Sequence, residues 1–174
     1  MAALNEAGVE LKKIAQYFYP FTGMGRRFQK VCEFNGITVY DDYAHHPTEI
    51  KAALQAAASK FGKENVVAVF QPHRFTRLQS LWKEFLTAFE NAGRVIVTDV
   101  YAASEDSIEG INGENFAAEL SCEYVSGNMQ DVARKLMPSL KKGDVVIGLG
   151  AGTITNLGKE SVSYTHLTLP TKRI

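Results

Sequence analysis

Two short polar blocks contain most of the side chains in this sequence that could do chemistry. The first is DDYAHHPTE at residues 41–49, and the second is QPHRFTR at residues 71–77. Each block follows an apolar, β-branched or aromatic run and opens a helical pattern, so each is expected at the carboxyl end of a strand. Loops at the carboxyl ends of parallel strands converge on one crevice. The histidines, arginines and aspartates of both blocks are therefore predicted to face one ligand.

The second block has the composition of an anion site. Arg74 and Arg77 are three residues apart at the start of a predicted helix and therefore share a face. A helix N-terminus favours anions, and two guanidinium groups beside it can grip a carboxylate or a phosphate. His73 precedes them, and His45 of the first block could bind an anion when protonated or a metal when neutral. The alternative is an exposed helix that carries ordinary surface arginines.

Carboxylates accompany these cations at the predicted strand ends. Asp42 could hydrogen-bond a ribose or help to hold a metal ion. Asp41 could equally be a solvated edge residue, and His46 a helix cap. A third block, DVYAASE at residues 99–105, could add the phenol of Tyr101 and a carboxylate to the same crevice, or could be a solvated loop.

A run of glycines, GLGAGT at residues 148–153, ends the last predicted strand. Glycine backbone amides can approach an anion closely, but tight packing at a strand–helix turn explains the run equally well. No GxxxxGK[ST] pattern occurs in the sequence, so the chain is not expected to hold a triphosphate in the manner of a P-loop.

Alternating strand-like and helical segments position these blocks. Asn35-Gly36 separates two strand-like runs and predicts a β-hairpin. The segments that follow predict an α/β fold, Rossmann-like, with a mostly parallel sheet, helices on both faces and an N-terminal β-hairpin element. Strands are expected at residues 28–33, 37–42, 65–71, 95–99, 123–125 and 144–149, and helices at residues 2–18, 47–61, 75–91, 112–120 and 128–140.

Composition and charge narrow the class of protein. The chain has 174 residues, and its 19 Lys+Arg balance its 19 Asp+Glu, so no overall field favours nucleic acid or an anionic membrane. No apolar run approaches the roughly 20 residues that span a bilayer, and the N-terminus lacks the pattern of a signal peptide. Cys32 and Cys122 form no CxxC and are typical of a reducing compartment. We therefore expect a cytoplasmic protein.

Five motifs, in order, resemble the C-terminal domain of the Mur ligases of peptidoglycan synthesis. They are RRFQ at residues 26–29, the two polar blocks, DVYAASE at residues 99–105 and GAG at residues 150–152. The two polar blocks together are specific to the member that adds L-alanine. The resemblance runs from about residue 1 to residue 159. Two features depart from the family pattern, because Thr153 replaces a usual acidic residue and the residues after Glu160 do not resemble the closing helix.

The resemblance implies an ATP-dependent amide ligase. In this family ATP phosphorylates the lactyl carboxylate of UDP-N-acetylmuramate, and the amine of L-alanine attacks the resulting acyl phosphate. The UDP-sugar lies on an N-terminal domain, the P-loop and the Mg²⁺ ligands lie on a central domain, and the C-terminal domain closes over both. Because neither of the first two domains is recognisable in this sequence, we expect the chain alone to be inactive.

The resemblance also implies roles for individual residues. Asp42 would contact the ribose of ATP, and no side chain of the chain is assigned to catalysis or to a metal ion. The cations would bind the carboxylate of L-alanine and the nearby anionic intermediate. The substrate-binding residues expected on this basis are His45, Arg74 and Arg77, with Tyr43, His73 and Tyr101 as second choices.

Three parts are expected along the chain. Residues 1–22 would be the end of the central ATPase domain and a linker, and residues 23–160 the C-terminal domain. Residues 161–174 show no apolar periodicity and would be a disordered or non-native tail.

Two other classes of protein remain open on the residues alone. A metal-dependent hydrolase would use Asp99 and the histidines of both polar blocks, although adjacent histidines usually point in different directions and no HExxH-like spacing occurs. A flavodoxin-like binding or receiver module would use Asp42 or Asp99 as an acceptor, and would leave Arg74 and Arg77 without a role. Zinc titration would test the first class, and phosphotransfer from a small phosphodonor would test the second.

Overall fold

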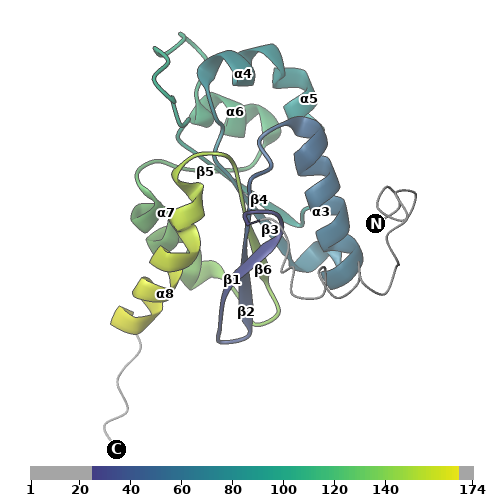
Figure 1. Cartoon of the computed structure of the whole chain (residues 1–174), viewed down its shortest axis with the longest axis vertical. Helices are drawn as coiled ribbons and strands as arrows, with labels where there is room; N and C mark the ends of the chain where they lie inside the picture. Colours follow the sequence, from purple (N-terminus) through teal and green to yellow (C-terminus); the bar gives the residue numbers. More distant parts are fainter. Residues whose placement is uncertain (1–24, 169–174) are drawn as a thin grey trace, which may run out of the picture.

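Hydrophobic strands and intervening helices form a six-stranded sheet in the computed structural model, which describes residues 25–168 (Figure 1). The order across the sheet is β1-β2-β6-β3-β4-β5, with β1 antiparallel to β2 and the other pairs parallel. The expected mostly parallel α/β sheet with an N-terminal hairpin is therefore confirmed. The strands are β1 Gln29–Phe34, β2 Ile37–Asp42, β3 Val66–Phe70, β4 Arg94–Thr98, β5 Glu123–Val125 and β6 Val145–Leu149.

Asn35 and Gly36 form the predicted hairpin turn. Phe34 pairs directly with Ile37, so the loop has only these two residues. Both have positive φ, 50° for Asn35 and 76° for Gly36. A two-residue turn of this kind matches the twist of the flanking strands, and Asn and Gly tolerate its backbone at little cost. The turn sets the pairing as far as Cys32 with Val39, and an irregularity between Lys30 and Cys32 then shifts it so that Gln29 pairs with Asp41.

Alternate residues of the central strands pack on opposite faces of the sheet. Ala68 and Phe70 of β3 belong to one core cluster, whereas Val67 and Val69 belong to the other. Helices cover both faces, as Figure 1 shows. The first face is covered by α3 Pro47–Phe61, α4 Phe75–Ser80, α5 Trp82–Leu86 and α6 Gly113–Leu120, and the second by α7 Met129–Leu136 and α8 Leu157–Thr168.

Helix α3 begins and ends at the predicted residues. Pro47 occupies the first turn, where its missing N–H costs nothing. Thr48 N donates to Nδ1 of His46, and the Glu49 carboxylate accepts from His46 N in return, which completes a capping box. His46 is therefore a helix cap, the simpler of the two roles that its sequence position allowed.

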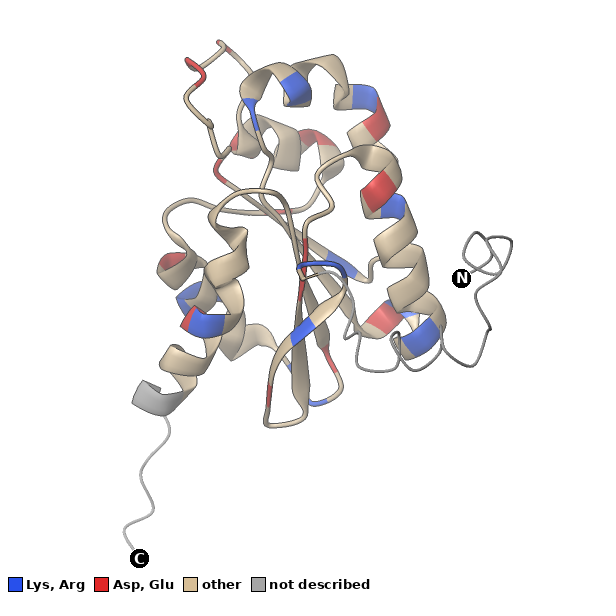
Figure 2. Cartoon of the chain, viewed as in Figure 1, with Lys and Arg blue, Asp and Glu red and all other residues tan. Residues whose placement is uncertain are grey.

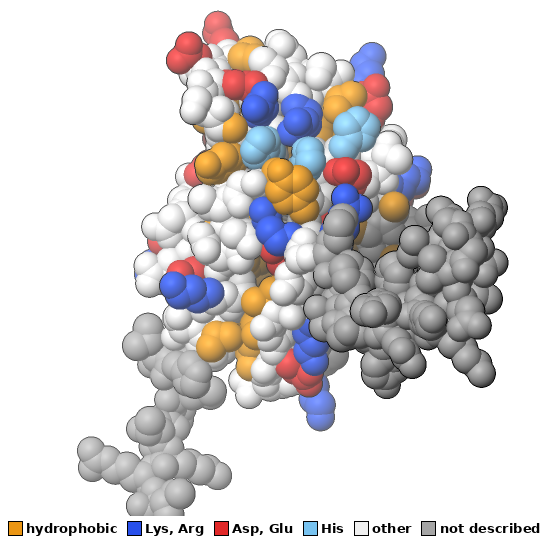
Figure 3. Space-filling model, viewed as in Figure 1, with side chains coloured by type: hydrophobic (Ala, Val, Ile, Leu, Met, Phe, Trp, Pro, Cys, Tyr) orange, Lys and Arg blue, Asp and Glu red, His pale blue; other side chains and the backbone are white. Residues whose placement is uncertain are grey.

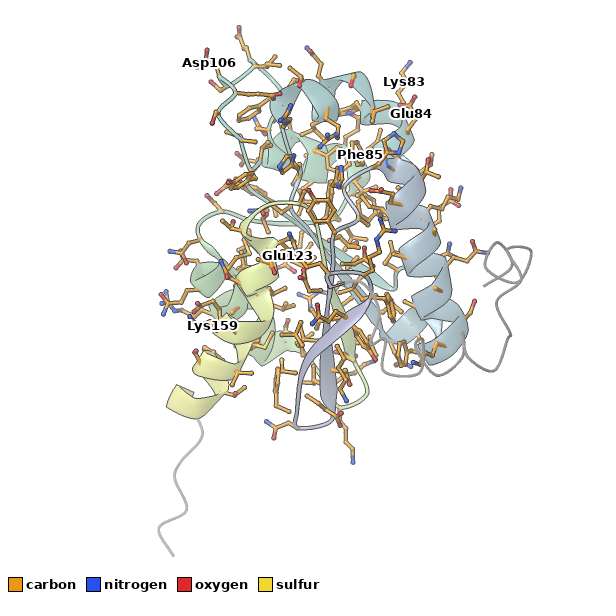
Figure 4. The ribbon with its side chains drawn as sticks, in the orientation of Figure 1. Lys83, Glu84, Phe85, Asp106, Glu123 and Lys159 are labelled. Carbon is orange, nitrogen blue, oxygen red and sulfur yellow. The ribbon has the colours of Figure 1, made fainter. Side chains whose placement is uncertain are left out.

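The helix predicted at residues 75–91 is interrupted, and this part of the prediction is wrong. Leu81, with φ −116° and ψ 21°, separates α4 from α5. The interruption lets Leu81 and Trp82, neighbours in sequence, both pack against the core. Figure 4 shows the result on α5, where Phe85 points inward while Lys83 and Glu84 point away from the molecule.

The helix predicted at residues 128–140 is also shorter than expected. Asn128 caps α7, which ends at Leu136, and a 3-10 turn follows over Met137–Ser139. Pro138 lies in that turn and has no N–H to continue an α-helix.

The expected tail at residues 161–174 begins inside helix α8, so its first half is corrected. Ser161 is fully buried and donates to Leu157 O at 2.7 Å, and Tyr164 packs beside the second core cluster. Packing against α7 and the sheet holds this segment, although its own sequence has no helical pattern. The helix expected at residues 2–18 and the remnant expected at residues 1–22 lie outside the described residues.

Basic and acidic residues are interspersed along the described part of the ribbon (Figure 2). Among the described helices, none combines the length and the hydropathy needed to cross a membrane.

Candidate functional site

The turns that follow β2, β3, β4 and β6 meet at one edge of the sheet. Gly150 N donates to Asp42 O at 3.1 Å, and Tyr101 N donates to Pro72 O at 2.8 Å, so backbone hydrogen bonds join the turns in pairs. Figure 3 shows the histidine side chains in a row on one face, with basic side chains beside them. The two polar blocks of the sequence therefore converge as predicted.

Tyr43 and His45 form the part of the site that follows β2. The guanidinium carbon of Arg26 lies 4.9 Å from the centre of the Tyr43 ring, which is a cation–π distance. The Tyr43 and His45 rings meet edge to face, with centres 5.0 Å apart. His45 Nδ1 lies 2.9 Å from Tyr43 O and 3.6 Å from a Glu49 carboxylate oxygen. Tyr43 remains 43% exposed, so its ring can contact a ligand.

His73 joins the turns after β3 and β4. Its ring stacks on Tyr101 with centres 5.4 Å apart and an interplanar angle of 19°. Arg77 Nη1 lies 3.0 Å from His73 Nδ1 and 3.2 Å from His73 O. The centre of the His45 ring is 6.0 Å away. We call His45, His73, Arg74, Arg77 and Tyr101 the histidine–arginine cluster.

Arg74 has an unusual backbone and a free side chain. Its φ is 72°, and its N–H donates to Tyr101 O at 2.9 Å. A non-glycine residue in this region costs on the order of 1–3 kcal/mol, and such residues concentrate at functional sites. Within the described range the Arg74 side chain has no hydrogen-bonding partner and is exposed. Its guanidinium donors are therefore available to a ligand.

The charges of the cluster suit an anion. Burial lowers the pKa of His73 below its ordinary value of 6.5, and the nearby Arg77 and His45 lower it further. His73 is therefore neutral at pH 7, and Arg74 and Arg77 carry the positive charge. Hydrogen bonds from Thr76 lower the pKa of Glu105 and keep that carboxylate ionised at the start of α4.

Asp42 borders a surface hollow that Tyr43 also lines. Its two carboxylate oxygens accept from Phe28 N and Ala44 N, each at 2.8 Å. A carboxylate oxygen has a second lone pair, so both can accept a further hydrogen bond from a ligand. The hollow has a volume of about 330 Å³ and is lined by Arg27, Phe28, Asp42, Tyr43, Ala44, Glu49, Ala52 and Ala53.

Asp41 is a buried structural residue, and the solvated role that its position allowed is wrong. It is 5% exposed, and its Oδ2 accepts from Arg26 Nε at 3.0 Å and from Thr155 Oγ1 at 2.9 Å. Arg26 Nη2 also donates to Gly150 O at 2.8 Å. The Arg26–Asp41 pair therefore ties the residues before β1 to the ends of β2 and β6.

Asp99 turns away from the crevice. Its carboxylate accepts from Tyr124 Oη, from Ser126 Oγ at 3.0 Å and from Gly127 N at 2.8 Å. These contacts fix the start of α7 to the end of β4. Of the third block, Tyr101 reaches the histidine–arginine cluster, whereas Asp99 does not.

The glycine turn after β6 is explained by packing. A Cβ at Gly152 would lie 2.6 Å from Cγ of Tyr101, and a Cβ at Gly150 would lie 2.8 Å from Gln71 O. Gln71 itself donates to Thr153 Oγ1 and accepts from Ile154 N, each at 2.9 Å. The glycines make room for Tyr101 and Gln71, so the packing alternative accounts for this motif.

Two arginines of the site were not assigned from the sequence. Arg26 supports Tyr43, and Arg27 lines the same hollow as Asp42. Counting back along the hairpin from Asn35-Gly36 does not locate Arg26, because the pairing shifts by one residue between Lys30 and Cys32. In the structure Tyr43 N donates to Arg26 O at 2.7 Å, beyond the last pair of the hairpin.

A metal ion has no evident place in the part of the chain that the structure describes. No three His, Cys, Asp or Glu side chains come together there in an arrangement that could hold one. The histidines of the cluster contact arginine and tyrosine side chains instead.

The sequence matches a known family over most of its length. Residues 26–152 match the family model described as Mur ligase, glutamate ligase domain. The chain belongs to this family. Mur ligase relatives with assigned names include the UDP-N-acetylmuramate–L-alanine ligase of Caldicellulosiruptor bescii, 48% identical over 158 residues, which are 88% of this chain and 34% of that protein. The enzyme of the same name from Pelobacter propionicus is 44% identical over 97% of this chain and 38% of its own length.

The chain spans about a third of the length of the curated relatives that it matches. A crystal structure of UDP-N-acetylmuramate–alanine ligase from Thermotoga maritima superposes with a TM-score of 0.76 at 27% identity, covering 97% of this chain and 36% of that one. A MurF ligase from the same organism, in complex with ADP, shares the fold with a TM-score of 0.62 at 18% identity, over 97% of this chain and 37% of that one. These findings support the Mur ligase interpretation and not the hydrolase or flavodoxin-like alternatives.

Proposed function

We propose that this chain is the domain of a UDP-N-acetylmuramate–L-alanine ligase that binds L-alanine and closes over ATP. The observation that carries the proposal is the histidine–arginine cluster, which places Arg74 and Arg77 beside two histidines in a member of the Mur ligase family. A small amino acid has one carboxylate to anchor and one amine to present. The cluster offers cations for the first.

Several residues of the histidine–arginine cluster bind the carboxylate of L-alanine. The exposed guanidinium of Arg74 donates to the carboxylate, and His45 and Arg77 add donors from the neighbouring turns. Holding the carboxylate at these points orients the amine towards the acyl phosphate of UDP-N-acetylmuramate, which lies on another part of the whole protein. This is catalysis by positioning, and no side chain of this domain needs to accept a proton.

The hollow beside Asp42 is the proposed contact with ATP. The Asp42 carboxylate accepts a hydrogen bond from a ribose hydroxyl, and Arg27 in the same hollow attracts the phosphates. Mg²⁺, which neutralises phosphate charge in ATP-dependent reactions, finds no matching ligand set among the described residues and belongs to the remainder of the protein.

Steady-state kinetics on a full-length enzyme test this assignment. This chain would be joined to the preceding two-thirds of the Caldicellulosiruptor bescii relative, and each substrate varied in turn. Losing a charge-assisted contact of roughly 2–4 kcal/mol lowers kcat/KM for alanine about 30- to 1000-fold in Arg74→Ala. Asp42→Ala should instead raise the KM for ATP. If Arg74→Ala raises only the KM for ATP and Asp42→Ala only the KM for alanine, the two assignments are inverted.

Two controls complete the test. Arg134→Ala removes an exposed arginine of α7 and should leave both substrates unaffected. The 174-residue chain alone should release no phosphate above background with ATP, L-alanine and UDP-N-acetylmuramate. Phosphate release that depends on all three would contradict the proposed division of labour between domains.

A further inference from the structure

His73 is the most constrained side chain of the cluster. Arg77 Nη1 lies 3.0 Å from its Nδ1, Tyr101 stacks on its ring, and the His45 ring is 6.0 Å away. Its backbone is fixed as well, because His73 and Tyr101 pair as an isolated parallel β-bridge. By contrast, Nε2 of His73 has no hydrogen-bonding partner among residues 25–168.

The contact with Arg77 determines the state of the His73 ring. A guanidinium group has only donors and is always protonated, so it cannot accept a hydrogen bond. Nδ1 of His73 must therefore be the acceptor and carry no proton. In a neutral imidazole the single proton then sits on Nε2.

We propose that Arg77 is a positioning residue that locks His73 as the neutral Nε2–H tautomer, which makes His73 a fixed hydrogen-bond donor to the bound anion and excludes it as a base. This inference rests on the proposed function only for the identity of the anion, which is the carboxylate of L-alanine. Nη1 of Arg77 is directed to Nδ1 and to the carbonyl oxygen of His73. The main hydrogen bonds to the carboxylate therefore come from the Arg74 guanidinium and from His73 Nε2–H.

The surroundings of His73 favour this state. The ring faces Arg77 from α4 and Arg74 from the cap before it. It also faces His45 from the turn after β2, and Tyr101 and Glu105 from the loop after β4. Only Glu105 favours a protonated ring, while burial and the cations oppose it. Protonation would set two N–H donors against each other across 3.0 Å and break the contact.

The lock also depends on the glycine turn. Tyr101 can lie flat against His73 because Gly152 leaves its ring free space, where a Cβ would come within 2.6 Å of Cγ. The stacked phenol of Tyr101 fixes the plane of the imidazole. The contact with Arg77 fixes which edge of the ring carries Nδ1.

Nitrogen-15 NMR of the histidine rings in the 174-residue chain, without any ligand, tests the proposal directly. We expect His73 to show the Nε2–H tautomer at neutral pH, with a preference of about tenfold, which is the ratio that one hydrogen bond of ordinary strength supports. Its titration midpoint should lie below the ordinary histidine value of 6.5. An Nδ1–H tautomer at His73, or a midpoint at or above 6.5, would overturn the proposal.

Variants separate the hydrogen bond from general electrostatics. Arg77→Met should abolish the tautomer preference and raise the His73 midpoint towards 6.5, and Arg77→Lys, which keeps a charged donor, should restore part of the preference. Arg134→Met removes an exposed arginine elsewhere and should change neither quantity. If the Nε2–H preference of His73 is unchanged in Arg77→Met, Arg77 does not fix the tautomer and the proposal is wrong. Because these measurements need neither ATP nor a complete enzyme, failure of the ligase assignment would show separately, in the kinetics described above.

Discussion

Replacing Arg26 by methionine is expected to destabilise the domain at the edge that carries the site. Methionine keeps the length and apolar stem of the side chain but removes its donors and charge. Three contacts disappear, namely the ion pair to Asp41 at 3.0 Å, the hydrogen bond to Gly150 O at 2.8 Å and the cation–π contact with Tyr43.

The burial of the two partners sets the size of the effect. The Asp41 side chain is 7% exposed, and its Oδ1 already has no partner among the described residues. Removing one member of a buried pair costs about 3–5 kcal/mol because a charge is left unpaired. The Arg26 side chain is 28% exposed, so solvent screens part of this, and we expect about 2–3 kcal/mol. For a domain of this size that corresponds to a fall in Tm of roughly 4–12 °C.

Thermal and urea unfolding followed by circular dichroism measures this cost. Arg134→Met is the matched control, because Arg134 also has an ion-pair partner, Asp131, but the two side chains are 62% and 40% exposed. An exposed pair of this kind contributes about 0.5 kcal/mol or less. Asp41→Asn added to Arg26→Met should recover stability, because no buried charge then remains. If Arg26→Met costs no more than Arg134→Met, the burial argument is wrong.

Three further outcomes are expected. Gly152→Ala should lower stability by about 1–3 kcal/mol in urea unfolding, because its Cβ would meet Tyr101 Cγ at 2.6 Å. Ending the chain at Glu160 removes the buried Ser161 and should lower Tm by more than about 4 °C, whereas an unchanged Tm would mean that α8 is dispensable. Burial raises the pKa of the Cys122 thiol to about 11, so alkylation at pH 8 in a Cys32→Ser background should be roughly 100-fold slower than in the unfolded chain.

Local signals in the sequence were sufficient for much of the fold. Asn35-Gly36 defined the hairpin, and Pro47 with Glu49 defined the start of α3, because turn and cap chemistry depends on neighbouring residues only. The break at Leu81 and the helix α8 were missed. Both depend on packing against distant elements, which helical periodicity does not describe.

The candidate site was likewise predicted only in part. The convergence of the two polar blocks followed from parallel-strand topology and is confirmed by the 6.0 Å between the His45 and His73 rings. The direction in which a side chain turns could not be predicted, and Asp99 turned towards the start of α7. Arg26 was missed because its role needs a three-dimensional meeting of the residues before β1 with the ends of β2 and β6.

The position of β6 has a consequence for how the domain acquires its structure. It is the last of the described strands in sequence, yet it lies between β2 and β3 and pairs with both. Until residues 145–149 are in place, the inner edges of β2 and β3 expose unpaired backbone groups and apolar side chains. Such long-range pairing is slow, and partly folded chains of this kind aggregate or are degraded. In a nested series of C-terminal truncations, resistance to protease should therefore rise most steeply at the step that includes Leu149.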